Sequence, residues 1–124
     1  MPELHPDRVL IVEMPDGRDM LKRALENAGF EVDVADTGEE ALRLAAARRP
    51  AVVISDIDLP IMNGWQLAAA LRARYGRRMR LVALTSRDES TERQRSEAAG
   101  FDVHLVKPVA PGLVHDTIRR LLIA

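Results

Sequence analysis

Five short apolar runs, separated by segments with helical periodicity, constrain the fold of this chain more than any other feature. The runs are RVLIV (8–12), EVDVA (31–35), AVVIS (51–55), RLVAL (80–84) and VHLV (103–106). Strands that alternate with helices favour a parallel sheet, because each helix carries the chain back to the edge where the strands begin. We therefore expect an α/β fold, a doubly wound five-stranded parallel sheet with five helices on its two faces.

The pattern within the runs predicts where each strand lies. The runs at 8–12, 51–55 and 80–84 each contain four consecutive apolar residues, as expected for central strands that are buried on both faces. The run at 31–35 alternates polar and apolar residues, which is typical of an edge strand.

Helix boundaries are indicated by capping residues. Asp16 is predicted to cap the first helix and Asn63 the third, while Thr37 and Glu40 match a capping box at the start of the second. The fourth helical segment, around 88–99, has little apolar character. A helix with few buried contacts has low local stability and can shift between states.

Composition narrows the class of protein. The 124 residues are the size of one domain, here 1–124 with a core of about 8–122. A net charge of −1 gives no reason to expect general binding to nucleic acid or anionic membranes, and the absence of cysteine excludes disulfides and thiolate metal sites. No apolar run is long enough to span a bilayer, and the N-terminus lacks a secretory signal. We expect a cytoplasmic domain.

Side chains suited to reactive chemistry at the far ends of the strands follow four of the five runs. Glu13 follows the first, Asp56 and Asp58 the third, Thr85 the fourth and Lys107 the fifth. Because the carboxyl ends of parallel strands meet at one edge of the sheet, these side chains are expected to lie close together.

This set matches the requirements of phosphoryl transfer to a carboxylate. Asp56 alone would be an ordinary strand-terminating acid, Thr85 a turn residue and Lys107 a solvated charge. Together they supply a nucleophile, a hydroxyl donor and a fixed cation, and a divalent metal would complete the site.

The segments ISDIDLPIMNG, ALTS and LVKP resemble the receiver domain of bacterial two-component response regulators, over nearly the whole chain from about Arg8. The resemblance implies a flavodoxin-like sheet of order 2-1-3-4-5. It also implies that Asp56 is phosphorylated by a sensor histidine kinase or a histidine phosphotransfer protein. Thr85 would move toward the phosphoryl group and Lys107 would contact it, with a cis peptide between Lys107 and Pro108.

The same resemblance implies a Mg²⁺ site and exposes a departure from the family. Receivers usually end the first strand with two acids, whereas this chain has Glu13 and Met14. Glu13 can replace the first acid. The soft, neutral thioether of Met14 cannot replace the second, so Mg²⁺ binding to Glu13, Asp56 and the backbone carbonyl of Asp58 should be weaker than usual.

Three consequences of Met14 stay open. In the first, Glu13 or the side chain of Asp58 supplies a replacement oxygen, and phosphorylation persists. In the second, the side chain of Asp16 turns back toward the metal site. Alternatively, the domain has lost phosphotransfer and signals through protein contacts alone.

Position 104 is a second departure, because receivers commonly carry Tyr or Phe there. His104 either rotates inward as part of the switch or is a surface residue of the fifth strand. As a titratable group near the output surface it could add pH sensitivity.

Two rival interpretations involve other motifs. ISDIDLP also resembles the D-x-D motif of haloacid-dehalogenase-like phosphohydrolases, but those enzymes carry it on the first strand and need a later acidic pair. The arginines of RARYGRRMR (72–80) are better explained as a solvated helix end than as a nucleic-acid patch, since stacking aromatics are few.

The resemblance therefore predicts a signalling domain, and no enzyme beyond slow autodephosphorylation. Its output surface would comprise the fourth helix, the fifth strand and the fifth helix. The partner would be a downstream protein or a fused output domain, without direct contact to nucleic acid or membrane. The sequence leaves open whether the chain is part of a longer protein and whether it forms a homodimer.

Overall fold

Five parallel strands form one sheet in the order β2-β1-β3-β4-β5 in this computed structural model, which describes residues 3–86 and 90–123. The strands are β1 His5–Val12, β2 Glu31–Ala35, β3 Pro50–Asp56, β4 Arg80–Thr85 and β5 Val103–Val106. The predicted strand order and the central positions of β1, β3 and β4 are confirmed, and β2 is an edge strand as expected.

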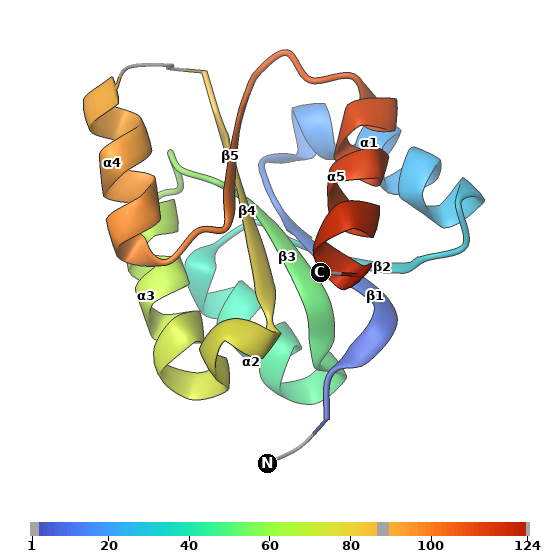
Figure 1. The fold of residues 1–124 in the computed structure, drawn as a ribbon, viewed down its shortest axis with the longest axis horizontal. Coiled ribbons are helices and arrows are strands. Elements are labelled where there is room, and N and C mark those ends of the chain that lie inside the picture. The colour runs from blue at the N-terminus through green and yellow to red at the C-terminus, as the bar shows by residue number, and fades with distance from the viewer. Residues whose placement is uncertain (1–2, 87–89, 124) are drawn as a thin grey trace.

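Helices cover both faces of the sheet (Figure 1). They are α1 Pro15–Asn27, α2 Gly38–Arg48, α3 Gly64–Tyr75, α4 Ser90–Ala99 and α5 Pro111–Ile123, with a short 3-10 turn at Gly76–Arg78. Helices α1 and α5 pack together on one face, and α2, α3 and α4 cover the other. Each face has its own apolar cluster, and the two clusters meet the sheet from opposite sides.

Two of the three predicted helix caps are confirmed. Asn63 forms a full capping box with Gln66, and the Thr37 hydroxyl accepts the Glu40 N–H at 3.1 Å. The prediction for Asp16 is wrong, because α1 begins at Pro15 and its N-cap is Met14 without a side-chain hydrogen bond. Proline suits the first helical position, where its missing N–H costs nothing.

Helix α4 is the least buried of the helices that the structure describes. It begins at Ser90, and residues 88–89 of the predicted helix lie outside the described part of the chain. Within Ser90–Ala99 only Ser96 is fully buried. The expectation of a weakly held fourth helix is therefore consistent with its packing.

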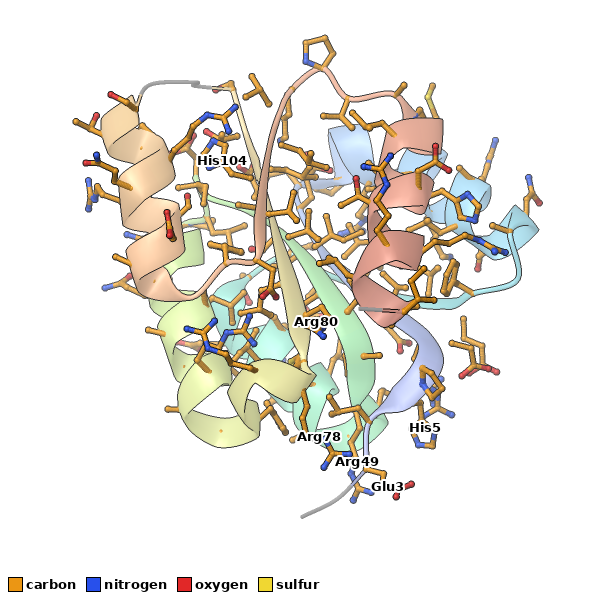
Figure 2. The ribbon with its side chains drawn as sticks, in the orientation of Figure 1. Glu3, His5, Arg49, Arg78, Arg80 and His104 are labelled. Atoms are coloured by element: carbon orange, nitrogen blue, oxygen red, sulfur yellow. The ribbon has the colours of Figure 1, made fainter. Side chains whose placement is uncertain are left out.

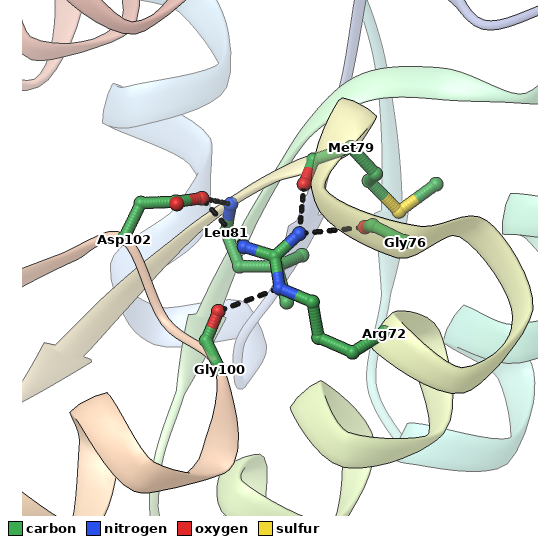
Figure 3. A network of polar contacts seen from close by, with 6 residues as sticks. All are labelled: Arg72, Gly76, Met79, Leu81, Gly100 and Asp102. Carbon is green, nitrogen blue, oxygen red and sulfur yellow. Dashed lines mark hydrogen bonds and ion pairs between the residues drawn. The ribbon is translucent and has the colours of Figure 1, made fainter.

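Arg72 is an exception to the expectation that the arginines around the end of α3 are solvated. Its guanidinium donates to the backbone carbonyls of Gly100, Gly76 and Met79 and to the Asp102 carboxylate at 2.7 Å (Figure 3). This one side chain thus joins the end of α3 to the start of β5. By contrast, Arg78 and Arg80 lie near the edge where the strands begin (Figure 2).

Candidate functional site

The carboxyl edge of the sheet brings Glu13, Asp56 and Lys107 into direct contact. Asp56 is the last residue of β3, Glu13 directly follows β1, and Lys107 directly follows β5. The Lys107 ammonium forms an ion pair with Glu13 Oε1 and lies 3.3 Å from Asp56 Oδ2. One cation therefore bridges two acids from neighbouring central strands.

Asp56 is held in place through both of its carboxylate oxygens. The Asp58 backbone N–H donates to Oδ1 at 3.1 Å, and Lys107 donates to Oδ2. The residue is 8% exposed. Gly64 is required behind it, because a Cβ atom there would come within 2.4 Å of the Asp56 carbonyl oxygen.

Thr85 lies beside this cluster on the next strand. It ends β4 and is fully buried, and its carbonyl accepts the Lys107 N–H at 2.7 Å. In the register of the sheet Asp56 is paired with Leu84, so Thr85 follows the residue opposite the acid. The predicted cis peptide between Lys107 and Pro108 is present.

The acidic neighbours of Lys107 favour the charged form of its ammonium group. Burial by itself lowers the pKa of Lys107, but the hydrogen bond that Lys107 donates to Glu13 and the charges of Asp56 and Glu13 outweigh it. The net result is a pKa raised above the ordinary value of 10.5. Lys107 is therefore charged throughout the physiological range.

The donor set can be compared with what Mg²⁺ requires. The Glu13 and Asp56 carboxylates and the Asp58 backbone carbonyl are hard oxygens, and Mg²⁺ is commonly held by one or two carboxylates while it keeps several waters. No cluster of three acidic, histidine or cysteine side chains that could hold a metal occurs among residues 3–86 and 90–123. The chemistry of these oxygens fits Mg²⁺.

Met14 and His104 are not part of this cluster. Met14 is 49% exposed and lines an open hollow together with Asp58 and Trp65. His104 is half-buried, and its Nδ1 lies 3.0 Å from the Ser96 hydroxyl of α4, so it is not simply a surface residue. Asp16 is in the first turn of α1.

Two residues around the site were missed by sequence reasoning. Gly17 of α1 lies against the Glu13 carboxylate, and Ser96 connects α4 to His104. Glycine in a first helical turn and serine in a polar helix are both common, so neither carries a recognisable signal.

Among the described residues, no helix combines the length and the apolar character needed to cross a membrane.

A family model described as the response regulator receiver domain matches residues 9–119.

The chain is 37% identical over 106 residues to the response regulator MprA of Mycolicibacterium vanbaalenii, an alignment that covers 85% of this chain and 46% of that protein. It thus spans about half the length of that relative.

Solved structures show the same architecture. Chemotaxis protein CheY4 of Vibrio cholerae is 33% identical with a TM-score of 0.87, over 92% of this chain and 97% of that one. The receiver domain of sensor histidine kinase PA1611 from Pseudomonas aeruginosa is 26% identical with a TM-score of 0.86, over 95% and 98% of the two chains. That structure has a magnesium ion coordinated in its active-site cleft.

Proposed function

The chain belongs to the receiver-domain family of two-component response regulators, and we propose that it accepts the phosphoryl group on the Asp56 carboxylate. The bridge from Lys107 to Glu13 and Asp56 is the observation that carries this assignment. It puts a buried carboxylate and a fixed cation within reach of one incoming phosphoryl group. The haloacid-dehalogenase interpretation is not favoured by these matches.

The reaction is a displacement at phosphorus. An Asp56 carboxylate oxygen attacks the phosphorus of a phosphohistidine on a sensor kinase or phosphotransfer protein. The new P–O bond forms as the P–N bond breaks, and the departing imidazole keeps the electron pair and takes a proton from water. The product is an acyl phosphate on Asp56.

Lys107 and Thr85 would stabilise this product. The phosphoryl group brings new negative charge to Asp56, and Lys107 already contacts Asp56 Oδ2. We expect the ammonium to pair with a phosphoryl oxygen, since charge-assisted hydrogen bonds are the stronger kind. The Thr85 hydroxyl is placed one strand away, where it could donate to another oxygen.

Glu13, Asp56 and the Asp58 carbonyl would hold Mg²⁺, which when bound neutralises part of the charge on the phosphoryl oxygens. We propose that it binds more weakly here than in receivers with a second acid. Met14 offers no hard oxygen, and Lys107 competes for both carboxylates.

The output would be a change in the surface formed by α4, β5 and α5. Phosphorylation can bias such a surface only if the two states make different contacts with the phosphoryl group. A downstream protein or an attached output domain is the proposed reader of this surface.

Phosphorylation with acetyl phosphate or phosphoramidate, followed by intact mass at increasing Mg²⁺, tests the proposal. Wild type should gain one phosphoryl group and Asp56→Asn none, while Met14→Asp should reach the same extent at lower Mg²⁺. If wild type gains nothing and Met14→Asp gains one group, the site is silenced by Met14 and the domain signals by binding alone. A gain that survives in Asp56→Asn would refute Asp56 as the acceptor.

A further inference from the structure

One buried hydroxyl joins helices α3 and α4 to strand β5. The Ser96 oxygen accepts the Trp65 indole N–H at 3.1 Å and lies 3.0 Å from His104 Nδ1. Ser96 is 1% exposed. The Arg95 guanidinium covers the Trp65 ring at 3.7 Å from its centroid. Figure 2 shows His104 between β5 and α4.

Two buried polar atoms, one on α4 and one on β5, lack a hydrogen-bond partner in the described part of the chain. They are His104 Nε2 and Glu92 Oε2. A buried polar atom without a partner is costly, and such atoms are rare enough to need an explanation. An imidazole nitrogen and a carboxylate oxygen are also a complementary pair, because a protonated imidazole donates where a carboxylate accepts.

Helix geometry turns Glu92 toward the strand that carries His104. Glu92 and Ser96 are four residues apart, so their side chains lie on the same face of α4, one above the other. Ser96 faces His104, and Glu92 therefore faces β5 one turn nearer the start of the helix. Because only Ser96 of α4 is fully buried, a small shift of this helix disturbs little packing.

We propose that Glu92 and His104 form an ion pair when His104 is protonated, and that this pair draws the first turns of α4 onto β5. In the neutral ring, one nitrogen donates and the other accepts. Protonation makes both nitrogens donors. The Ser96 oxygen can then accept from Nδ1, and Nε2 needs a second acceptor, which Glu92 supplies.

The other charges around His104 largely cancel. A cavity of about 460 Å³ beside the ring is lined by Arg77, Arg93, Glu97 and Asp102. Two are cations and two are anions, and Asp102 is already paired with Arg72. On the β4 side, the register partner of His104 is the apolar Ala83. Arg95 is stacked on Trp65. Within the described part of the chain, Glu92 Oε2 is thus an acceptor available to a second ring N–H.

The inference does not depend on phosphorylation of Asp56. It makes the α4–β5 surface pH-sensitive in the unmodified protein, so it can be tested there. Failure of phosphorylation at Asp56 would leave it standing, and its own failure would leave the acceptor site untouched.

The test is an NMR titration of the histidine rings from about pH 5 to about pH 8. His5 and His115 serve as internal references. In Glu92→Gln the midpoint of the His104 titration should fall by about half a pH unit or more, because a neutral amide attracts the imidazolium less than a carboxylate does. Glu97→Gln is the matched control, since it removes an equal charge from the same helix, and it should move the midpoint less.

The backbone amides of 90–99 give a second measurement. In wild type they should shift with the same midpoint as the His104 ring, and in Glu92→Gln and His104→Phe this movement should be lost. Equal midpoints in Glu92→Gln and Glu97→Gln would overturn the proposal. Backbone amide signals of α4 that stay unchanged when His104 is protonated would also overturn the proposal.

Discussion

Gly17 lies directly against the carboxylate of Glu13, since a Cβ atom at residue 17 would approach Glu13 Oε1 at 3.2 Å. Glu13 has one methylene more than an aspartate, and the missing side chain at residue 17 leaves room for it. The longer acid can therefore pair with Lys107. The two residues act as a matched pair across the β1–α1 junction.

This pairing predicts a coupling between the two positions. Gly17→Ala in a helix should stabilise by about 1 kcal/mol, but here the methyl group would crowd Glu13 and remove much of that gain. In a Glu13→Asp background, Gly17→Ala should give the full gain. Urea unfolding of the four proteins measures the coupling, which we expect to be about 0.5 kcal/mol or more. Additive effects would show that Gly17 and Glu13 are independent.

The raised pKa of Lys107 predicts how stability changes in alkali. A lysine whose pKa is raised on folding stabilises the protein fully below the ordinary lysine value of 10.5, and this contribution is lost as the pH rises through the raised folded value. The stability difference between wild type and Lys107→Gln should hold at neutral pH and shrink above about pH 10.5.

Lys22→Gln is the control for this titration, because Lys22 is the other lysine of the chain. Its ion pair with Glu26, at 4.0 Å on the surface of α1, should contribute about 0.5 kcal/mol or less. A Lys107→Gln effect as small as this, or one that persists above the pKa of Lys107, would contradict the bridge.

The thioether at position 14 leads to a prediction: introducing one carboxylate there should change the affinity for Mg²⁺. Trp65 is the one tryptophan of the chain and lines the same hollow as Met14 and Asp58, so its fluorescence should report Mg²⁺ binding. Met14→Asp should tighten Mg²⁺ binding about tenfold. Ile123→Asp is the control, since Ile123 is 87% exposed at the end of α5 and lies outside this hollow. Equal tightening in both variants would indicate a general charge effect.

The backbone conformation of Ile61 predicts that a suitable substitution at this position will stabilise the protein. It is 93% exposed and has a φ of +67°, a left-handed conformation that is strained for a β-branched residue. Ile61→Asn should raise the free energy of unfolding by about 1 kcal/mol, because asparagine tolerates this conformation. Ile61→Val keeps the branch and should give no gain. Equal stabilities of the two variants by thermal unfolding would refute the strain.

Arg72 predicts a large loss of stability. Arg72→Met would leave the partly buried Asp102 carboxylate without its cation and three carbonyls without a donor, which should cost about 3 kcal/mol in urea unfolding. The neighbouring Arg74 is exposed, so Arg74→Met should stay within about 0.5 kcal/mol. Similar losses in both variants would mean that the Arg72 contacts contribute little.

The order of elements could be predicted from the sequence because strand and helix periodicities are local. Asn63 was recognised as a cap because asparagine is favoured at this position, and the structure shows its capping box with Gln66, three residues later. Asp16 was misassigned because Asp, Pro and Met all occur around a helix start, and the backbone decided which one is the cap. The acids and Lys107 were grouped correctly because parallel strands end at one edge of a sheet.

The sequence by itself determined which residues form strands and helices and which strand ends carry the reactive groups. Only the tertiary structure decided their partners. Arg72 finds Asp102 thirty residues later, Lys107 bridges Glu13 and Asp56, and Ser96 meets His104 across α4 and β5. These contacts depend on how helices pack on the sheet. That packing is set by the whole apolar core, and no local pattern in the chain encodes it.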